Sequence, residues 1–535
     1  MAELQVAAII NGFDLDGPTT FAAIFFCMNL VWTTFLVYDV RRGANPPRML
    51  ASLGLYCHTI PALLLLLTTV TAQTVHDSAL VWFVALLVFR YWRTVVQIFF
   101  WFRYEFVMST GKEKIKGADC TVIVPTVGPI GNSVFGEMVC AILVNQPARL
   151  IFSTNTQEAA EAVNAFLQEL RLDFKAGVTP YQQQYGIGAT DLVTEFEVVN
   201  ANISNKREQV VHGFSLVKTD VLVMVDDTAI WHPEFLHATL PAFNDDRVGF
   251  VGTRKWVKRL PRTADLAAGF FTNLLMQYYA GFWNAIGGLY LIRHNFEIRS
   301  SNAADGGVFC VSGRSSLIRS KIINNDGFKH AFLNEYVLRL GECFPGWGPV
   351  TADDDNFITR WVINNGWKIK IQSSKQATMT TVLGKLDPLK FPDQCKRWSR
   401  TTFRQNPIAL FVDRTVWWQW PITTWITLLP WLYNAALLWD GLAVYTFVHT
   451  QKYTESDQQT MLLCTLILCI WLTKLVKTLS WFWAYPADFF LYFVIPAYPM
   501  FAYYHSCLKI WTAFTFWDLA WSGRKLPKTP KAEGM

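Results

Sequence analysis

Val221-Leu-Val-Met-Val225 is followed at once by Asp226-Asp227-Thr228, a change from apolar residues to two carboxylates that is typical of a buried strand ending at a polar sheet edge. Short apolar runs at 121–125, 149–153 and 192–199 predict three more strands, and amphipathic patterns at 157–172 and 207–216 predict helices between them. Strands that alternate with helices favour a parallel, Rossmann-like α/β sheet. Ligands of such sheets bind at the carboxyl ends of the strands.

The paired carboxylates Asp226 and Asp227 have two interpretations. Mg²⁺ and Mn²⁺ prefer oxygen ligands and keep phosphates and water in their shells, so two aspartates at a strand end suit a metal that bridges a diphosphate. Asp and Thr are also good N-caps, so the same residues suit the start of a helix. The residues alone leave both interpretations open.

A second acidic cluster, Thr351-Ala-Asp-Asp-Asp355, is predicted to open a helix that ends at Asn364-Asn365-Gly366. Acidic residues favour helix N-termini through the helix dipole, which is one explanation of the cluster. Three neighbouring aspartates in a cleft would also repel one another and raise at least one pKa, as suits a general base.

A third element, Gln394-Cys-Lys-Arg397-Trp398, opens a basic stretch that reaches Arg404. Such a stretch is typical of an amphipathic helix that lies on lipid headgroups before a membrane span. That interpretation is compatible with a role in binding a substrate.

The composition indicates a lipid environment. Charged residues make up 16% of the chain, against about 25% in soluble globular proteins. Apolar residues, 52% of the total, concentrate at the two ends and flank a mixed region at about 109–415. An ordinary soluble enzyme and a disordered protein are excluded as first interpretations. The ten cysteines form no Cys-x-x-Cys pair, which argues against a zinc site and a disulfide framework, and the net charge of +6 predicts no nucleic-acid partner.

A helix needs about 20 apolar residues to cross the hydrocarbon core of a bilayer. The predicted spans are 17–38, 49–72, 78–102, 416–439 and 462–483. A further run, 489–508, carries Pro496 and Pro499 in its middle, so we expect a re-entrant or interfacial helix there. Basic residues follow the first and third spans, which places the N-terminus outside and the central region in the cytosol of a multi-pass protein, with the plasma membrane as the expected location. Arg90 and Arg93 in the third span either snorkel to the interface or line a polar path.

The order of these elements resembles the membrane-integrated family 2 glycosyltransferases, which include the cellulose, chitin and hyaluronan synthases. The pattern is most similar to the hyaluronan synthases and the type 2 glycosyltransferases of filamentous fungi. Four segments beside the Asp-Asp pair and the Gln-x-x-Arg-Trp motif carry the resemblance: Asn205-Lys206-Arg207-Glu208, Val308-Phe-Cys310-Val-Ser312-Gly313, Asp354-Asp355 with Ile358, and Trp517-Asp-Leu-Ala-Trp521-Ser-Gly-Arg524.

The resemblance implies a GT-A catalytic domain at 109–390, between an N-terminal membrane region at 1–108 and an interfacial helix at 391–415. Two spans at 416–485, the re-entrant helix at 486–516 and a gating loop with a cytosolic tail at 517–535 would follow. It also implies that Asp355, beside Asp354, is the catalytic base and that Asp227, with Asp226, binds Mn²⁺ or Mg²⁺. The implied substrate-binding residues are Lys206, Arg207, Cys310, Ser312, Gly313, Gln394, Arg397, Trp398, Trp521 and Arg524.

The expected activity is inverting, processive transfer of sugar from a nucleotide-sugar, a UDP-sugar by the resemblance, to a growing polysaccharide that is translocated across the bilayer. Val225 replaces the first aspartate of the family's Asp-x-Asp metal motif. Asn155 stands where the family has an aspartate that binds uridine, so the identity of the donor base stays open. One alternative is a non-processive glycosyltransferase that acts on a lipid acceptor. The other is a transporter with a cytosolic regulatory domain, which Arg90 and Arg93 would suit.

Overall fold

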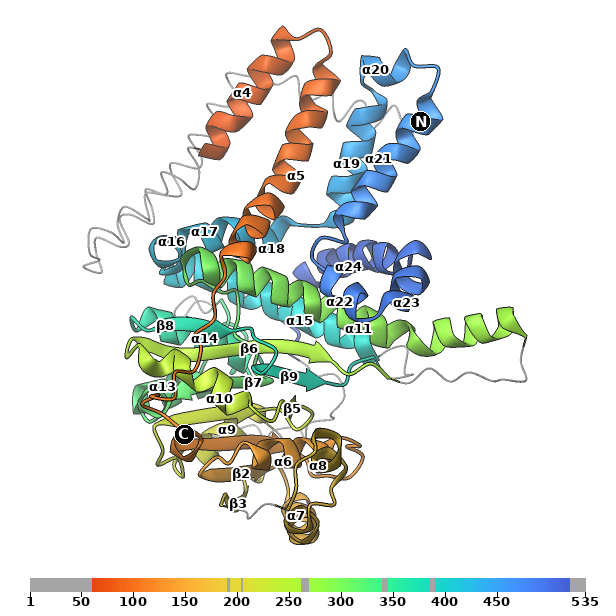
Figure 1. Cartoon of the computed structure of the whole chain (residues 1–535). Helices are drawn as coiled ribbons and strands as arrows, with labels where there is room; N and C mark the ends of the chain where they lie inside the picture. Colours follow the sequence, from red (N-terminus) through yellow and green to blue (C-terminus); the bar gives the residue numbers. More distant parts are fainter. Residues whose placement is uncertain are drawn as a thin grey trace, which may run out of the picture.

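The computed structural model describes residues 60–189, 193–203, 205–260, 269–338, 345–384 and 390–519. The predicted span 17–38 and the predicted gating residues Trp521 and Arg524 lie outside these ranges. Figure 1 shows an α/β body, a layer of long helices across one end of it, and helices that project beyond that layer.

The described residues form a nine-stranded sheet in the order β3-β2-β1-β4-β7-β6-β9-β5, with β8 paired to β6. The strands are β1 Cys120–Thr126, β2 Arg149–Thr154, β3 Glu195–Asn200, β4 Val221–Val225, β5 Ile230–Trp231, β6 Val248–Val257, β7 Ser315–Arg319, β8 Lys368–Gln372 and β9 Thr378–Thr381. All four predicted strands are present, the third of them beginning at 195. The sheet is mixed rather than wholly parallel, because β7 lies antiparallel between β4 and β6.

The central strand β4 is apolar throughout because helices cover both faces of the sheet. Val221, Val223 and Val225 face one hydrophobic core, and Leu222 and Met224 face the other. The covering helices are α6 Phe135–Val144, α7 Gln157–Ala176, α8 Pro180–Tyr185, α9 Lys206–Phe214, α10 Phe235–Thr239, α12 Ser320–Ile323, α13 Asp326–Leu333 and α14 Asp354–Asn364. Both helices predicted between the strands are therefore confirmed.

Two long helices, α11 Phe270–Asp305 and α15 Lys390–Pro407, lie across the sheet on the side of the projecting helices (Figure 1). Residues 284–302 of α11 are largely buried between β6, α5 and the C-terminal helices. The sheet and the C-terminal helices are thus joined through a shared helical layer.

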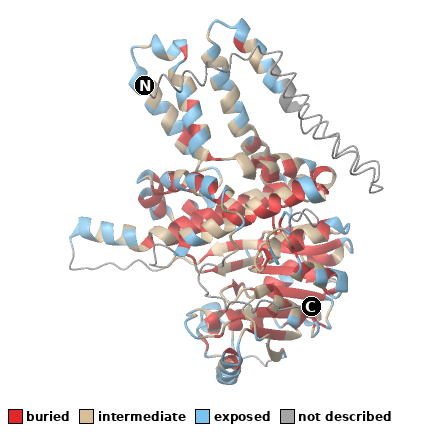
Figure 2. Cartoon of the chain, turned by 180° about the vertical axis from the view of Figure 1, so that it is seen from behind, coloured by how far each residue is buried: buried red, intermediate tan, exposed pale blue. Residues whose placement is uncertain are grey.

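The helices beyond this layer are α4 Ile60–Thr74, α5 Ser78–Arg103, α19 Ala436–Val448, α20 Gln451–Thr454 and α21 Gln459–Thr473. Four of them, α4, α5, α19 and α21, project as two pairs, and Figure 2 shows their surfaces as mostly exposed or half-buried. Within the described ranges, α5 is the one helix long and apolar enough to cross a membrane, whereas α19 and α21 are apolar but shorter.

The predicted span at 416–439 is wrong as a single helix. The chain instead forms α16 Val416–Gln419, α17 Pro421–Thr423, a π-helical turn η5 Thr424–Leu428 and α18 Leu429–Tyr433 before α19 begins. Pro421 is the first residue of α17 and Pro430 the second residue of α18, positions that proline tolerates because it donates no backbone hydrogen bond to a preceding turn. The predicted span at 462–483 is likewise divided between α21 and α22 Leu479–Ala484.

The double-proline run forms α23 Pro486–Phe489, the π-helical turn η6 Phe490–Val494 and α24 Ala497–Ala513. The break at Ile495 and Pro496 agrees with the expectation that this run is not a continuous helix. Helix α24 packs along α15 and α11, so its buried face belongs to the helical layer.

We expect Gly288→Ala to lower the free energy of unfolding by about 1–3 kcal/mol, since it overpacks a closed contact. A Cβ atom at Gly288 on α11 would overlap the ring of Trp481, which is fully buried and donates its indole N–H to Asp488 over 3.0 Å. A thermal unfolding midpoint of the purified protein measures the effect. Gly441→Ala on α19 is the matched control, because open space surrounds that position and alanine favours a helix. Equal midpoints for the two variants would contradict the prediction.

Candidate active site

A cleft of about 630 Å³ opens where β4 ends, between the sheet and α15. It is the meeting point of segments that lie far apart in the sequence. Of the predicted site residues, the cleft is lined by Lys206, Asp226, Asp227, Cys310, Ser312, Gly313, Asp354, Asp355, Gln394, Arg397 and Trp398.

Asp226 and Asp227 lie directly after β4 in a turn in which the Ala229 amide donates to the Asp226 carbonyl. No helix begins in this turn, so the N-cap interpretation is wrong; the chain continues into β5. The Thr126 hydroxyl donates to the Asp227 carboxylate over 2.9 Å, and the Asn132 side chain donates to the Asp227 carbonyl over 2.6 Å. The Asp227 carboxylate is thereby oriented at the wall of the cleft.

Lys206, the first residue of α9, lies between the two acidic clusters. Its ammonium is 2.9 Å from Asp226 and 3.0 Å from Asp354. Burial alone would lower the pKa of Lys206, but the two carboxylates outweigh burial and raise it. Burial would raise the pKa of Asp226, and Lys206 outweighs this and lowers it. Lys206 and Asp226 therefore stay charged, and one cation is shared by two carboxylates.

The aspartates at the start of α14 differ in their partners. Asp355 accepts a hydrogen bond from the Gly313 amide over 3.2 Å, and its pKa is raised by burial and by the charge of Asp354, against the lowering effect of Lys206. A carboxylate with a raised pKa that faces a cleft has the property expected of a general base. The geometry thus agrees with the expectation that this cluster contains a carboxyl with a raised pKa.

Asp353 faces α15 and anchors it. Its carboxylate receives two hydrogen bonds from Arg404, over 2.7 and 3.0 Å, and one from the Thr401 hydroxyl over 2.5 Å. Asp353 has a positive φ of 60° and precedes α14 as its N-cap residue. Burial would raise the pKa of Asp353, but Arg404 outweighs burial and lowers it.

Helix α15 presents its Gln-x-x-Arg-Trp motif to the cleft rather than only to a lipid surface. The Trp398 ring stacks on Tyr290 of α11 with 5.5 Å between ring centroids, and the Arg314 guanidinium lies 5.1 Å from the centre of the Trp398 ring. Cys310 lines the same cleft as Trp398 and Tyr290. Its thiol is buried, and burial raises the pKa of that thiol. The thiol is therefore neutral and suits packing or a contact rather than nucleophilic attack.

Arg207 does not line the cleft, which corrects its predicted role in substrate binding. Its side chain is fully buried, pairs with Glu335 over 2.6 Å, and donates to the carbonyls of Ala352 and Asp353 over 2.9 and 3.1 Å. These bonds hold the loop before α14. Arg207 is a positioning residue, because it acts through the backbone that carries Asp354.

Sequence reasoning missed three cations of the cleft, Arg314, Lys255 and Lys390. Arg314 follows Ser312-Gly313 directly, so proximity to that motif was an available signal. Lys255 lies on β6 and is 4% exposed, and burial together with Arg314 lowers its pKa to about 8. No motif marks Lys255, since the pairing of β6 with β7 and β9 places it there.

The residues present fit a divalent metal with few protein ligands. Among the residues that the structure describes, no group of three or more His, Cys, Asp or Glu side chains could hold a metal ion. Asp227 and Asp226 supply two carboxylates at the cleft wall, which suits an ion that takes its other ligands from phosphate and water.

We expect Asp353→Asn to lower the free energy of unfolding by about 3 kcal/mol, because it leaves the buried Arg404 guanidinium without a counter-charge. Denaturant unfolding of the purified protein measures the change. Asp326→Asn is the control, since that carboxylate is 98% exposed and its pairing with Lys329 contributes little. A stability equal to that of the control would show that the Asp353–Arg404 pair does not anchor α15.

Comparisons with known proteins agree with this geometry. Residues 118–401 match the family model described as "Glycosyltransferase like family 2". A type 2 glycosyltransferase of Zymoseptoria tritici is 29% identical over 443 residues, which cover 83% of each chain. A type 2 glycosyltransferase of Gibberella zeae is 28% identical over 447 residues, which cover 83% of this chain and 75% of the relative.

Two solved structures are also similar. The mannosyltransferase PcManGT of Pyrobaculum calidifontis, in complex with GDP-Man and Mn²⁺, is 12% identical with a TM-score of 0.42, over 81% of this chain and 97% of that one. Glucosyl-3-phosphoglycerate synthase of Mycobacterium tuberculosis, in complex with Mn²⁺, UDP and phosphoglyceric acid, is 10% identical with a TM-score of 0.26, over 51% and 73%.

The matched region, 118–401, contains the whole sheet, both acidic clusters and the Gln-x-x-Arg-Trp motif. The match decides between the enzyme and the transporter alternatives in favour of the enzyme. The chain belongs to the family 2 glycosyltransferases and carries their GT-A-like α/β domain.

Proposed function

We propose that this glycosyltransferase is an inverting, metal-dependent polysaccharide synthase that uses a nucleotide-sugar, for which we favour a UDP-sugar. The observation that carries the proposal is the single cleft in which Asp227, Asp355 and Trp398 come together. Donor, base and acceptor platform then share one space, as direct transfer of a sugar requires.

The reaction would proceed in one displacement. An acceptor hydroxyl oxygen attacks the anomeric carbon, the bond from that carbon to the diphosphate oxygen breaks, and the hydroxyl proton passes to Asp355. Lys206, Arg314 and Arg397 line the cleft and would face the charge that develops on the leaving diphosphate. Attack from the side opposite the leaving group inverts the anomeric configuration.

The proposed metal site consists of Asp227 with Asp226. Mn²⁺ or Mg²⁺ bound there would neutralise part of the diphosphate charge. We assign the closer metal contact to Asp227, whose carboxylate lies at the cleft wall and accepts a hydrogen bond from the Thr126 hydroxyl.

The proposed acceptor platform is the stacked pair Trp398 and Tyr290, beside Cys310, Ser312, Gly313 and Gln394. Sugar faces pack on aromatic rings, and a stack from two helices gives a broad apolar surface. Trp521 and Arg524 lie outside the described residues, and we retain them as a proposed gating segment that closes the cleft.

We further propose that the catalytic domain, 109–390, is cytosolic and that the chain is a multi-pass protein of the plasma membrane. Support comes from α5, whose length suits a span and whose apolar side chains are exposed. The exposed side chains on this helix include Trp82, Val84, Val88, Phe89, Val95, Phe99 and Phe102. A surface of this kind is stable in lipid and not in water. Translocation of the product and processive extension are part of the same proposal.

The direct test incubates the purified enzyme with each common UDP-sugar and with GDP-mannose, and measures nucleotide release and product length. Long products that grow without release of intermediates support a processive synthase. Products extended by one sugar would instead favour the non-processive alternative with a lipid acceptor. Absence of nucleotide release with every UDP-sugar would contradict the proposed donor.

We expect Asp227→Asn to abolish the dependence of turnover on Mn²⁺ or Mg²⁺, because an amide does not replace a carboxylate as a metal ligand. Turnover against metal concentration measures the change. Asp173→Asn, an exposed position on α7, is the control and should keep the wild-type metal titration. A normal titration in Asp227→Asn would place the metal elsewhere or remove it from the mechanism.

We expect Asp355→Asn to bind donor normally while transfer falls by about two to four orders of magnitude, the usual contribution of a general base. The wild-type rate should decline as the pH falls, because Asp355 must be ionised to accept a proton. A free aspartate side chain has a pKa of about 3.9. Because the pKa of Asp355 is raised, the rate should decline at a higher pH than it would with an ordinary aspartate as the base. The pH profile of kcat/KM measures both effects, and an Asp355→Asn variant with the wild-type profile would rule out this base.

A further inference from the structure

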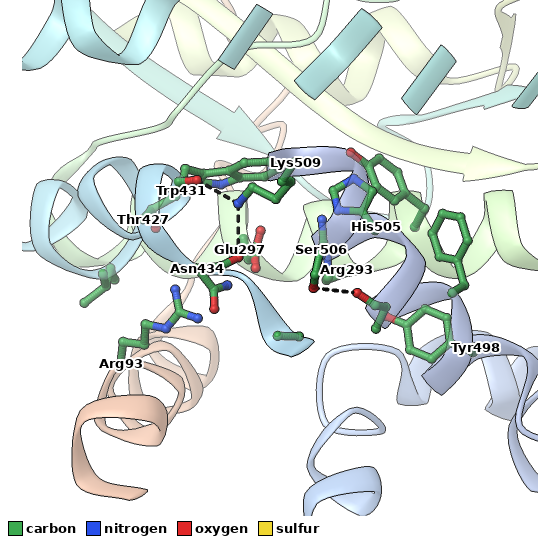
Figure 3. A pocket seen from close by; sticks show the side chains of 15 residues that line it. Arg93, Arg293, Glu297, Thr427, Trp431, Asn434, Tyr498, His505, Ser506 and Lys509 are labelled. Carbon is green, nitrogen blue, oxygen red and sulfur yellow. Dashed lines mark hydrogen bonds between the residues drawn. The ribbon is translucent and has the colours of Figure 1, made fainter. Parts of the chain in front are cut away.

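A second cavity, of about 70 Å³, lies between α5, α11, α18 and α24. We call it the basic cavity, after its ionisable lining residues Arg93, Arg293, Glu297, His505 and Lys509. Tyr290 and Trp431 line both this cavity and the catalytic cleft, so the two spaces share a wall. In Figure 3, Arg93 points from α5 toward Asn434, and Lys509 points from α24 into the same region.

Positive charge exceeds negative charge around this cavity. Glu297 contributes the one carboxylate of the lining, and Lys477 already pairs with it over 2.8 Å. Arg93, Arg293 and Lys509 are then left without a carboxylate partner in the part of the chain that the structure describes. Lys509 donates only to the backbone carbonyls of Trp431 and Asn434, over 2.7 and 3.2 Å.

Four polar groups of the lining are buried without a complete set of partners, and one of them is the Oε2 atom of Glu297. Arg93 is 8% exposed, and within the described residues no hydrogen bond or ion pair engages its guanidinium. The Nε atom of Arg293 and the Nε2 atom of His505 are also buried without a hydrogen-bond partner there. Buried cations are normally paired, because an unpaired one loses its hydration without compensation.

Two cations near the cavity, Arg90 on α5 and Lys474 at the end of α21, show the usual arrangement. Arg90, one turn before Arg93 on α5, pairs with Asp440 over 3.1 Å, and Lys474 pairs with the same carboxylate over 2.8 Å. Next to the basic cavity one carboxylate thus pairs with two cations, whereas the single carboxylate of the lining, Glu297, pairs with Lys477 and not with Arg93, Arg293 or Lys509. This contrast indicates that the missing anion comes from a ligand.

We propose that the basic cavity binds a phosphate group, at a site distinct from that of the nucleotide diphosphate. A phosphate dianion balances more of the three cations than a carboxylate does, and the arginine fork matches its oxygens. The volume suits a small tetrahedral anion with some water, since one water needs about 10–15 Å³ by this measure.

The phosphate has two possible sources with the same chemistry, a lipid headgroup and a free phosphate ion. Arg93 belongs to α5, the helix that suits a membrane span, so a headgroup has a route to the cavity along that helix. The wall shared with the cleft would place a bound headgroup beside the acceptor platform. This inference concerns a binding site, and it does not depend on whether the enzyme is processive.

The test uses the full-length protein in detergent, saturated with Mg²⁺ and a nucleotide diphosphate so that the donor site is filled. Calorimetric titration with inorganic phosphate should show binding that Arg93→Gln weakens by about tenfold or more, the effect of losing one charge-assisted contact. Arg103→Gln, an exposed arginine at the end of the same helix, is the matched control and should bind phosphate as the wild type does.

A second arm uses nanodiscs of phosphatidylcholine alone or mixed with phosphatidic acid, with bound lipid measured by native mass spectrometry. If the wild type retains phosphatidic acid, the Arg93→Gln variant does not, and inorganic phosphate does not bind, the site belongs to a lipid headgroup. If inorganic phosphate binds, the site belongs to the free ion. If Arg93→Gln does not fold, Arg293→Gln takes its place, and phosphate should still raise the unfolding midpoint of the wild type. Absence of binding in both arms, equal binding by Arg93→Gln, or tighter binding of acetate than of phosphate would overturn the proposal.

Discussion

The ammonium of Lys206 lies 2.9 Å from Asp226 and 3.0 Å from Asp354, and the arrangement of the cleft depends on this shared cation. Asp226 belongs to the end of the sheet, whereas Asp354 begins a helix that is 128 residues further along the chain. Two carboxylates that both lie about 3 Å from the same ammonium would repel each other without that positive charge. Lys206 opposes that repulsion, but burial and the charge of Asp354 still raise the pKa of Asp355.

A second set of buried charges connects the cleft with the helical layer. Arg207 holds the backbone of the loop before α14, and Asp353 in that loop pairs with Arg404 on α15. Arg404 also donates to the carbonyl of Phe516 over 2.7 Å, and Arg400 pairs with Asp518 over 2.6 Å. The acidic loop, α15 and the segment after α24 are therefore held as one unit. A change of position in the C-terminal segment would be transmitted to the carboxylates of the cleft through α15.

The catalytic cleft and the basic cavity differ in how far the chain's own carboxylates balance its cations. In the catalytic cleft, cations and carboxylates both come from the chain, and the excess of charge is small because Lys206 serves two aspartates. In the basic cavity, the pairing of Glu297 with Lys477 leaves the remaining cations uncompensated. The stacked rings of Tyr290 and Trp398, together with Trp431, separate the two environments with an apolar wall.

The sequence by itself determined the α/β class, the four strands β1 to β4, and the motifs that line the cleft, because period and residue type at a strand end are local properties. It did not reveal that the run 416–439 is broken, since mean hydropathy does not register where Pro421 and Pro430 interrupt the hydrogen-bond ladder. Only the tertiary structure decided that Arg207 is buried against Glu335 while Lys206 faces the cleft, because two adjacent residues at the start of a helix point in different directions. It alone also placed Lys255 in the cleft and Arg93 beside Lys509, since those neighbours come from elements that no local pattern connects.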